Sequence, residues 1–116
     1  MKDRKILFVE VDSYWQAKMS KFLRNIKNFK LTIVSDLKEA QKVSVNEDFD
    51  VIICAGTVQE YHDGVWWCYD LDDKGQQVIL FCDDSFNGVL RISTDEFYYT
   101  RVIQLIAQKI RTKSNG

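Results

Sequence analysis

The chain has 116 residues, of which 46% are apolar and 28% charged, as in a single soluble globular domain large enough to bury a core. Its formal net charge of −1 creates no overall positive field, which argues against a nucleic-acid partner or an anionic membrane. No apolar run approaches the roughly 20 residues needed to span a bilayer, and the run after the charged amino terminus is too short for a signal peptide.

The chain has three cysteines, one histidine and no proline. The cysteine and histidine counts limit the disulfide and metal sites that it can form. Cys54, Cys68 and Cys82 are widely spaced within or beside apolar segments and form no Cys-x-x-Cys pair. Such a set indicates reduced thiols in a cytoplasmic protein. With a single histidine a zinc site is not expected, and we expect no cofactor.

The first third of the chain predicts two strands around one helix. Residues 5–9 and 30–34 are apolar runs of strand length. Ser13 is a good N-cap for a helix that should end near residue 28. The core-facing residues of this helix follow at helical spacing: Trp15, Met19, Phe22, Leu23 and Ile26.

The run from Phe49 to Gly56 predicts a strand buried on both faces, because it is apolar throughout its centre and too short for a helix. It ends in Ala55 and Gly56, at the edge where open α/β sheets carry their sites. A helix capped by residues 35–36 precedes it. The inward residues of that helix are Leu37, Ala40 and either Val43 or Val45.

The second half is less regular. Residues 62–64 favour a turn and residues 65–71 a short helix, and strands are expected at 77–82 and 89–92. Ser93 to Glu96 has the S-x-x-E form of a capping box before a final helix. The apolar face of that helix comprises Tyr98, Val102, Leu105, Ile106 and Ile110. The polar end, 111–116, is either a tail or the start of a linker.

This alternation predicts one α/β domain over residues 1–116, with three layers and a mostly parallel five-stranded sheet. Only residues 83–88 join the last two strands, whereas a helical crossover needs about 10–12 residues. Either the fourth helix is reduced to a loop and the fifth strand stays parallel, or Asn87-Gly88 forms a hairpin and makes it antiparallel.

These segments resemble the receiver domain of bacterial response regulators over nearly the whole chain. Residues 5–12 resemble the first strand with its acidic cluster, and 50–55 resemble the third strand. Asp63-Gly64 resembles the Asp-Gly pair that follows the phosphorylation site, and 78–82 the fourth strand. The resemblance implies strand order 2-1-3-4-5 and a role in two-component signal transduction.

The chain departs from the receiver pattern where that family carries out its chemistry. The phosphorylated Asp is expected five positions after Asp50, where this chain has Ala55. Of the two leading acids only Glu10 remains, because Val11 replaces the other. Cys82 replaces the hydroxyl residue that ends the fourth strand.

The switching residues of the family are absent as well. Leu90 or Arg91 stands where receivers have the Lys of a Lys-Pro pair, and Asn87 or Gly88 at the aromatic switch position. Such losses resemble pseudo-receiver domains, which signal through protein contacts without phosphotransfer. We therefore expect no catalytic residue and no enzyme activity.

A small flavodoxin-like enzyme is the alternative. Glu10, Asp12, Asp83 and Asp84 could form a weak divalent-cation site, with Glu10 and Asp12 as first candidates, although capping of helices is favoured for them. Cys82 could be a reactive thiol but is favoured as a small apolar residue. His62 could be a base but is expected at the surface. The enzyme would lack a Gly-rich phosphate loop and an acid–base pair.

A third interpretation is the receiver-like half of a truncated transcription regulator, although the chain holds no helix-turn-helix pattern. For the signalling interpretation, aromatic residues suggest a partner surface. Adjacent tryptophans face different sides of a helix, so one of Trp66 and Trp67 should be exposed. The candidate surface residues are Trp66, Trp67, Tyr69, Phe86, Phe97, Tyr99 and Ile103. Self-association through the last helix and fifth strand is also possible, or these residues fill gaps in the core.

Overall fold

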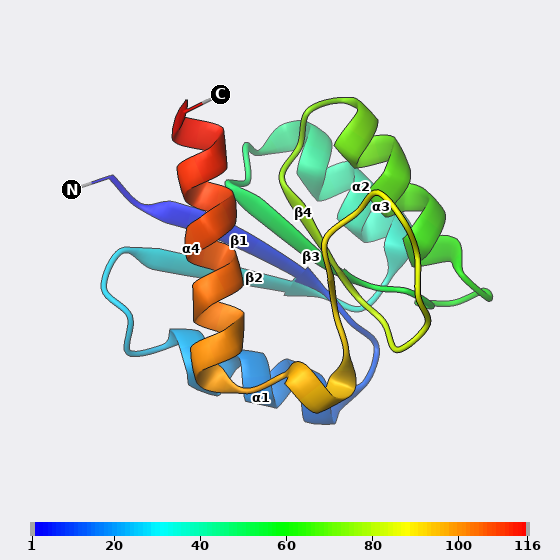
Figure 1. The fold of residues 1–116 in the computed structure, drawn as a ribbon, viewed down its shortest axis with the longest axis horizontal. Coiled ribbons are helices and arrows are strands. Elements are labelled where there is room, and N and C mark those ends of the chain that lie inside the picture. The colour runs from blue at the N-terminus through cyan, green and yellow to red at the C-terminus, as the bar shows by residue number, and fades with distance from the viewer. Residues whose placement is uncertain (1, 116) are drawn as a thin grey trace.

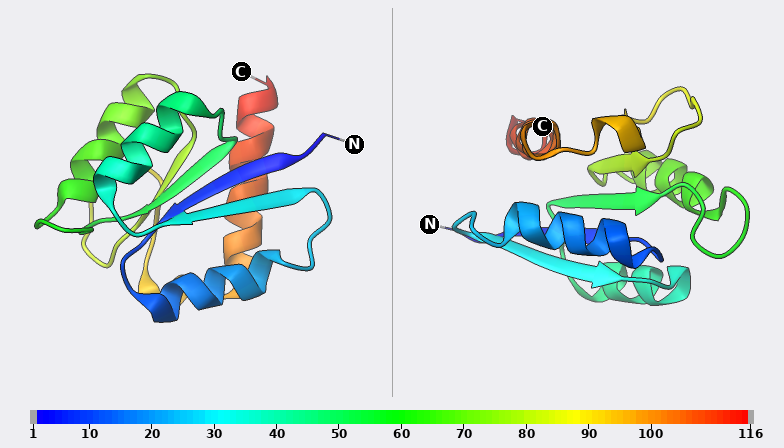
Figure 2. Two further views of the ribbon diagram at one scale, coloured as in Figure 1. Left: turned by 180° about the vertical axis from the view of Figure 1, so that it is seen from behind. Right: turned by 90° about the horizontal axis from the view of Figure 1, so that it is seen from below.

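In a computed structural model, which describes residues 2–115, the chain forms a parallel sheet with helices on both faces (Figures 1 and 2). The order along the sheet is β2-β1-β3-β4-β5, as predicted. The elements are β1 (Arg4–Val9), α1 (Ser13–Leu23), β2 (Phe29–Val34), α2 (Leu37–Asn46), β3 (Val51–Ala55), α3 (Asp63–Asp73), β4 (Val78–Phe81), β5 (Arg91–Ile92), the 3₁₀ helix η1 (Thr94–Glu96) and α4 (Tyr99–Asn115).

The sheet separates two hydrophobic cores, because successive strand residues point to opposite faces. Helices α2 and α3 cover one face, and α1 and α4 cover the other (Figure 2). On the α2/α3 side the central strands bury Leu7, Val9, Ile52, Cys54 and Leu80. On the α1/α4 side they bury Ile6, Phe8, Val51, Ile53 and Ile79. Each large side chain buried in this way contributes about 2 kcal/mol.

The boundaries of the first two helices differ slightly from the prediction. Asp12, not Ser13, is the N-cap of α1, because its carboxylate accepts a hydrogen bond from the N–H of Tyr14 at 2.8 Å. Helix α1 ends at Leu23, short of residue 28, and Asn28 takes a left-handed conformation (φ 72°) just before β2. In α2 the choice between two valines is decided: Val43 packs against the core and Val45 is 85% exposed.

Strand β5 is parallel to β4, with Leu80 opposite Arg91 and Phe81 opposite Ile92, so the hairpin alternative is wrong. The fourth crossover helix is missing, and residues 82–90 form a loop in its place (Figure 1). Strand β5 begins only at Arg91, two residues later than predicted. The loop is therefore longer than the predicted connection and can return to the start of a parallel strand.

The capping box at Ser93 and Glu96 is present, but it caps η1 rather than α4. This extra turn rotates the start of the last helix relative to the prediction. Phe97 is 1% exposed and packs beside Phe81, with ring centroids 4.4 Å apart, whereas Tyr98 is 51% exposed. Phe97 is thus a core residue and Tyr98 a surface residue, the reverse of the prediction. Farther along, α4 buries the predicted Val102, Leu105 and Ile106.

None of the helices within residues 2–115 has the length and hydropathy that crossing a membrane would require.

Candidate functional site

The carboxyl ends of β1, β3 and β4 bring the predicted site residues to one edge of the sheet. Glu10 follows β1, Ala55 ends β3 and Cys82 follows β4. Backbone hydrogen bonds continue the sheet past the strand ends, from the N–H of Glu10 to Val34 and from that of Gly56 to Phe81, both at 3.0 Å. This is the edge at which open α/β sheets bind ligands.

At the centre of this edge the tip of β3 is apolar and closely packed. Ala55 is 5% exposed and offers no nucleophile. A Cβ atom on Gly56 would lie 2.8 Å from the Sγ of Cys82, so the sulfur occupies space that a side chain at Gly56 would need. Cys82 is half-buried there, consistent with its interpretation as a small apolar residue.

Arg91 lies beside this position, but its guanidinium is bound to the backbone. Its Nη1 donates to the carbonyl oxygens of Cys82 at 2.9 Å and Asp83 at 3.3 Å. The Arg91 side chain therefore connects β5 to the end of β4 by hydrogen bonds. This contact links the last two strands at the carboxyl edge of the sheet.

Glu10 is 7% exposed, and one of its carboxylate oxygens accepts a hydrogen bond from the N–H of Asp12 at 3.0 Å. Burial raises the pKa of Glu10 above its ordinary value, although backbone hydrogen bonds from Asp12 and Val11 partly oppose the shift. A buried carboxyl that resists ionisation is a poor ligand for a hard cation unless other carboxylates join it.

The other acids of this edge are engaged in structural contacts. Asp12 caps α1, as described above. Asp83 accepts hydrogen bonds from the N–H of Thr94 at 2.7 Å and from its hydroxyl at 2.9 Å, tying β4 to η1. Asp84 lies 3.2 Å from the Nε2 of His62. Among residues 2–115 no three His, Cys, Asp or Glu side chains are grouped as a metal site would need. These contacts favour the capping interpretation.

Asp63 organises the loop between β3 and α3. Its carboxylate accepts hydrogen bonds from the N–H groups of Val58 at 2.7 Å, Gln59 at 3.0 Å and Glu60 at 2.9 Å. Burial acts to raise the pKa of Asp63, but these hydrogen bonds outweigh it and lower the pKa. Asp63 thus holds a compact loop over the tip of β3.

Gly64 lets α3 start directly against β3. A Cβ atom at this position would lie 1.8 Å from the carbonyl oxygen of Ala55. The N–H groups of Gly64 and Val65 both donate to the carbonyl of Gly56, at 3.0 and 3.2 Å. The Asp-Gly pair noted in the sequence therefore has a structural purpose: the Asp shapes the loop and the Gly permits close approach.

His62, which was expected at the surface, has a side chain that is 18% exposed and joins two loops. It has a left-handed conformation (φ 62°) immediately before α3. Its ring stacks on Tyr61 at 3.7 Å and meets Phe86 edge-on at 5.1 Å. With the contact to Asp84, these interactions attach the loop before α3 to the loop 82–90. Sequence spacing gives no signal for this contact, because both partners lie in loops.

The predicted partner residues fall into two groups. Trp66 is 64% exposed on α3, and Tyr99 is 49% exposed at the start of α4. Tyr69, Phe86 and Ile103 are half-buried. Trp67 and Phe97 are buried in the two cores, so they are not available to a partner, and their place in the predicted surface is corrected.

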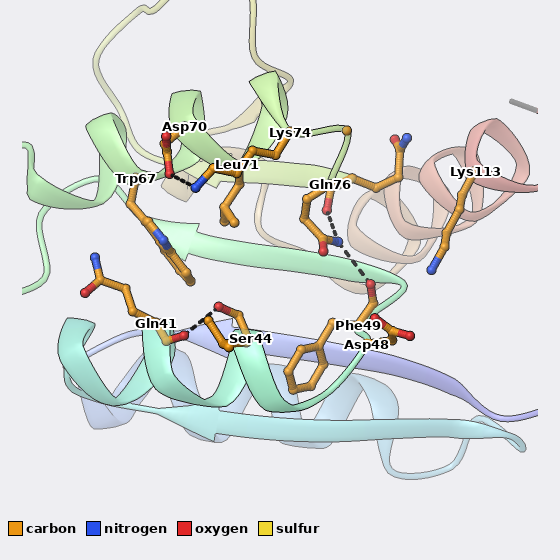
Figure 3. A pocket seen from close by; sticks show the side chains of 13 residues that line it. Gln41, Ser44, Asp48, Phe49, Trp67, Asp70, Leu71, Lys74, Gln76 and Lys113 are labelled. Atoms are coloured by element: carbon orange, nitrogen blue, oxygen red, sulfur yellow. Dashed lines mark hydrogen bonds and ion pairs between the residues drawn. The ribbon is translucent and has the colours of Figure 1, made fainter.

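Two cavities were not predicted. One lies between α2 and α3 and has a volume of about 560 Å³ (Figure 3). The other, of about 520 Å³, is a groove at the surface of α1 and the start of α4. It is lined by Tyr14, Ala17, Lys18, Lys21, Phe22 and Tyr99. Neither could be read from the sequence, because grooves between helices depend on how the helices pack.

No model of a known protein family matches the sequence, and no curated protein matches it. Solved structures do match its fold. The signal receiver domain of an HD domain-containing protein from Pseudomonas fluorescens Pf-5 superposes with a TM-score of 0.83 at 12% identity, covering 99% of this chain and 100% of that one. The chain has the fold of a receiver domain.

Two further receiver structures agree. The receiver domain of a modulated diguanylate cyclase from Desulfovibrio desulfuricans G20 has a TM-score of 0.82 at 14% identity, covering 97% of this chain and 98% of that one. That of a DNA-binding response regulator from Colwellia psychrerythraea 34H has a TM-score of 0.79 at 18% identity, covering 94% and 99%. At such identities the likeness extends to the receiver fold and carries no residue-level function with it.

Proposed function

We propose that this chain is a pseudo-receiver: a non-enzymatic signalling module that acts through protein contacts and needs no phosphoryl transfer. The observation that carries the proposal is Ala55 at the tip of β3, where the fold would present its acceptor carboxylate. An alanine cannot accept a phosphoryl group. The thiol of Cys82 lies beside it, packed against Gly56, and forms no hydrogen bond to a base within residues 2–115, so nothing there activates it as a replacement nucleophile.

The surrounding charges support the same proposal. Receivers hold Mg²⁺ with several carboxylates, whereas here Glu10 is buried and Asp12 and Asp83 are engaged in hydrogen bonds. Arg91 is bound to backbone carbonyls of the β4 end. A competing enzyme of flavodoxin-like topology would need at least one of these groups free.

Treatment with acetyl phosphate and Mg²⁺, followed by intact-mass measurement, tests the proposal. We expect no acid-labile adduct on the protein, while a receiver domain that retains its acceptor Asp is modified in parallel. The Ala55→Asp variant is a stricter test, because it supplies an acceptor carboxylate. We expect it also to stay unmodified, because Val11 and Cys82 leave the Mg²⁺ and phosphoryl contacts incomplete. A phosphoryl adduct on the wild-type chain would overturn the proposal.

For the partner surface we propose two aromatic areas, each with exposed residues at its centre. The first is on α3, the loop before it and the loop 82–90, and comprises Tyr61, Trp66, Tyr69 and Phe86, with acidic residues of α3 beside it. The second is the groove of α1 and α4 that contains Tyr14 and Tyr99, with Lys18 and Lys21 at its rim. Exposed aromatic residues are the usual anchors of protein interfaces.

Affinity capture from the native host with single variants tests these surfaces. If Trp66 is an anchor, Trp66→Ala should weaken binding of the captured partner by roughly 2 kcal/mol, about 30-fold, without changing the stability of the folded chain. Tyr99→Ala tests the second surface by the same capture. It also tests self-association through α4, which sedimentation measures. Val45→Ala, at an 85% exposed position on α2, is the matched control. Equal capture by all variants would exclude both surfaces.

A further inference from the structure

The charges of this chain nearly cancel, but they are unevenly distributed along it. Residues 13–35 and 97–116, which include α1 and α4, contain no Asp or Glu and carry five and four of the 16 Lys and Arg residues. Residues 43–73, which include α3, contain no Lys or Arg and eight Asp or Glu residues. Helices α1 and α4 cover one face of the sheet and α3 covers the other (Figure 2). One face of the molecule is therefore basic, and the opposite face is acidic along α3.

The groove of α1 and α4 is the concave part of the basic face. Its volume is about 520 Å³, and four of the six residues that line it are apolar or aromatic. The other two are Lys18 and Lys21. The ammonium group of Lys18 lies 5.6 Å from the ring centroid of Tyr14 and 5.3 Å from that of Trp15. Neither lysine has an acidic partner among residues 2–115, so the groove suits an aromatic side chain flanked by carboxylates.

The outer side of α3 has this composition. Trp66, Asp70 and Asp73 are spaced by four and three residues, so they share one side of the helix. Trp66 is 64% exposed, and both aspartates are exposed. Asp70 is paired with Lys74 at 2.8 Å, whereas Asp73 has no cationic partner in the described part of the chain. The outer side of α3 is thus complementary to the groove in polarity and in charge.

We propose that the groove of one copy of this chain receives α3 of a second copy, with Trp66 entering the groove and Asp70 and Asp73 facing Lys18 and Lys21. This inference rests on the two partner surfaces proposed above and names a second copy as the partner that fits both. A net charge of −1 gives no repulsion that would keep two copies apart. Removal of the Trp66 ring from water supplies most of the affinity, and the exposed ion pairs orient the contact.

The contact is of the head-to-tail type, because the two surfaces lie on opposite faces of the molecule (Figure 2). Each copy that donates α3 still has an empty groove, so the contact adds further copies, whereas a symmetric contact stops at a dimer. One aromatic anchor and a few exposed ion pairs make a small interface. Association should therefore become measurable only at protein concentrations of about 0.1–1 mM.

Sedimentation velocity of the purified chain over a concentration series tests the inference. We expect the average sedimentation coefficient to keep rising up to about 1 mM protein without a plateau at the dimer. Raising the NaCl concentration from about 0.05 M to about 0.5 M should weaken association at least fivefold, because salt screens the ion pairs. A chain that stays monomeric at about 1 mM, or a plateau at the dimer, overturns the inference. Either result leaves the acetyl phosphate test of the pseudo-receiver proposal unchanged.

Two variants that each lose one surface make the test specific. Trp66→Ala removes the anchor and keeps the groove, whereas Ala17→Glu places a carboxylate in the groove and keeps α3. Both positions are exposed, so the fold should persist, and circular dichroism checks this. Each variant alone should be monomeric, and an equimolar mixture should form pairs of one copy of each. Only the groove of Trp66→Ala can then receive an intact α3.

Val45→Glu is the matched control for Ala17→Glu. It changes the net charge equally at an 85% exposed position on α2, which contributes to neither surface, and it should associate as the wild type does. The inference is wrong if the mixture of Trp66→Ala and Ala17→Glu stays monomeric, or if either variant alone associates as strongly as the wild type.

Discussion

Gly64 shows how a single missing side chain positions a whole element. The helix α3 begins so close to β3 that a Cβ atom would overlap the carbonyl oxygen of Ala55 at 1.8 Å. The clashing atom belongs to the backbone of β3, which cannot move aside as a flexible side chain can. The helix itself would therefore have to move. The geometry of the loop over the sheet edge therefore depends on this residue.

Gly64→Ala should lower the free energy of unfolding by about 3 kcal/mol, because overpacking against backbone displaces α3. Urea denaturation monitored by circular dichroism measures the loss. Gly75→Ala is the matched control: it has a left-handed backbone (φ 88°) but open space around it. It should cost only about 1 kcal/mol from backbone strain. Equal losses in the two variants would show that close approach is not the cause.

Glu10 gives the site a measurable pH dependence. Because burial raises its pKa in the folded state, the folded protein holds this proton more tightly than the unfolded chain does. Stability from this group is therefore present below the unfolded pKa and is lost as the pH rises through the folded pKa.

Glu10→Gln removes the titration but keeps an oxygen that can accept from the N–H of Asp12. We expect the variant to gain stability relative to wild type at pH 7 compared with pH 4, as urea midpoints over this range would show. Glu60→Gln, which removes a carboxyl from an exposed position, is the matched control. If the difference for Glu10→Gln stays constant with pH, ionisation of Glu10 does not oppose folding.

Among the elements, the loop 82–90 is the most unusual, because it replaces a helix. It is held by polar contacts on both sides: Asp84 meets His62, Asp83 binds Thr94, and the hydroxyl of Tyr69 donates to the carbonyl of Asn87 at 2.5 Å. These polar contacts act together with Val89, which is buried in the core on the α2/α3 side, and Phe86, which packs against that core.

Tyr69→Phe should loosen the loop locally, because it removes the hydroxyl and leaves the ring. A net hydrogen bond is worth about 1 kcal/mol, so amide hydrogen exchange around residues 86–88 should accelerate about fivefold while α4 is unaffected. Tyr61→Phe is the control, since the Tyr61 side chain is 79% exposed and its hydroxyl bonds to no residue within 2–115. Unchanged exchange in Tyr69→Phe would mean that other contacts hold the loop.

The strands and their order could be predicted because buried parallel strands leave short, continuous apolar runs, as in the Phe49–Gly56 segment. Helix ends could not be predicted with the same accuracy. The choice between Asp12 and Ser13 as the cap depends on backbone geometry. Phe97 was misplaced because the one turn of η1 rotates α4 by an amount that helical spacing alone does not reveal.

The candidate site could be predicted in part. The placement of Glu10, Ala55 and Cys82 at one edge of the sheet follows from strand order. The sequence also indicated that one of two adjacent tryptophans is buried, but not which one, because the orientation of α3 on the sheet is a tertiary property. The cavity beside Trp67 was missed for the same reason.

At the scale of the whole molecule, the polar groups at the two edges of the sheet stabilise different parts of the fold. At the carboxyl edge, hydrogen bonds shape the loops over an apolar tip. At the amino edge, the buried carboxylate of Asp50 accepts from the N–H of Lys5 at 2.8 Å and lies 3.3 Å from Lys113 and 3.9 Å from Arg4. One carboxylate thus connects the start of β1 with the end of α4.

Because Arg4 and Lys113 meet at Asp50, the first strand starts where the last helix finishes (Figure 1). The same arrangement in space could therefore be reached by a chain that begins at a different element. A circular permutant, with a short Gly-Ser linker joining the old ends and new ends at the exposed turn of Lys74 and Gly75, should fold to the same sheet. Its circular dichroism spectrum should match that of the wild type, and a permutant that stays unfolded would show that β1 must precede the other strands.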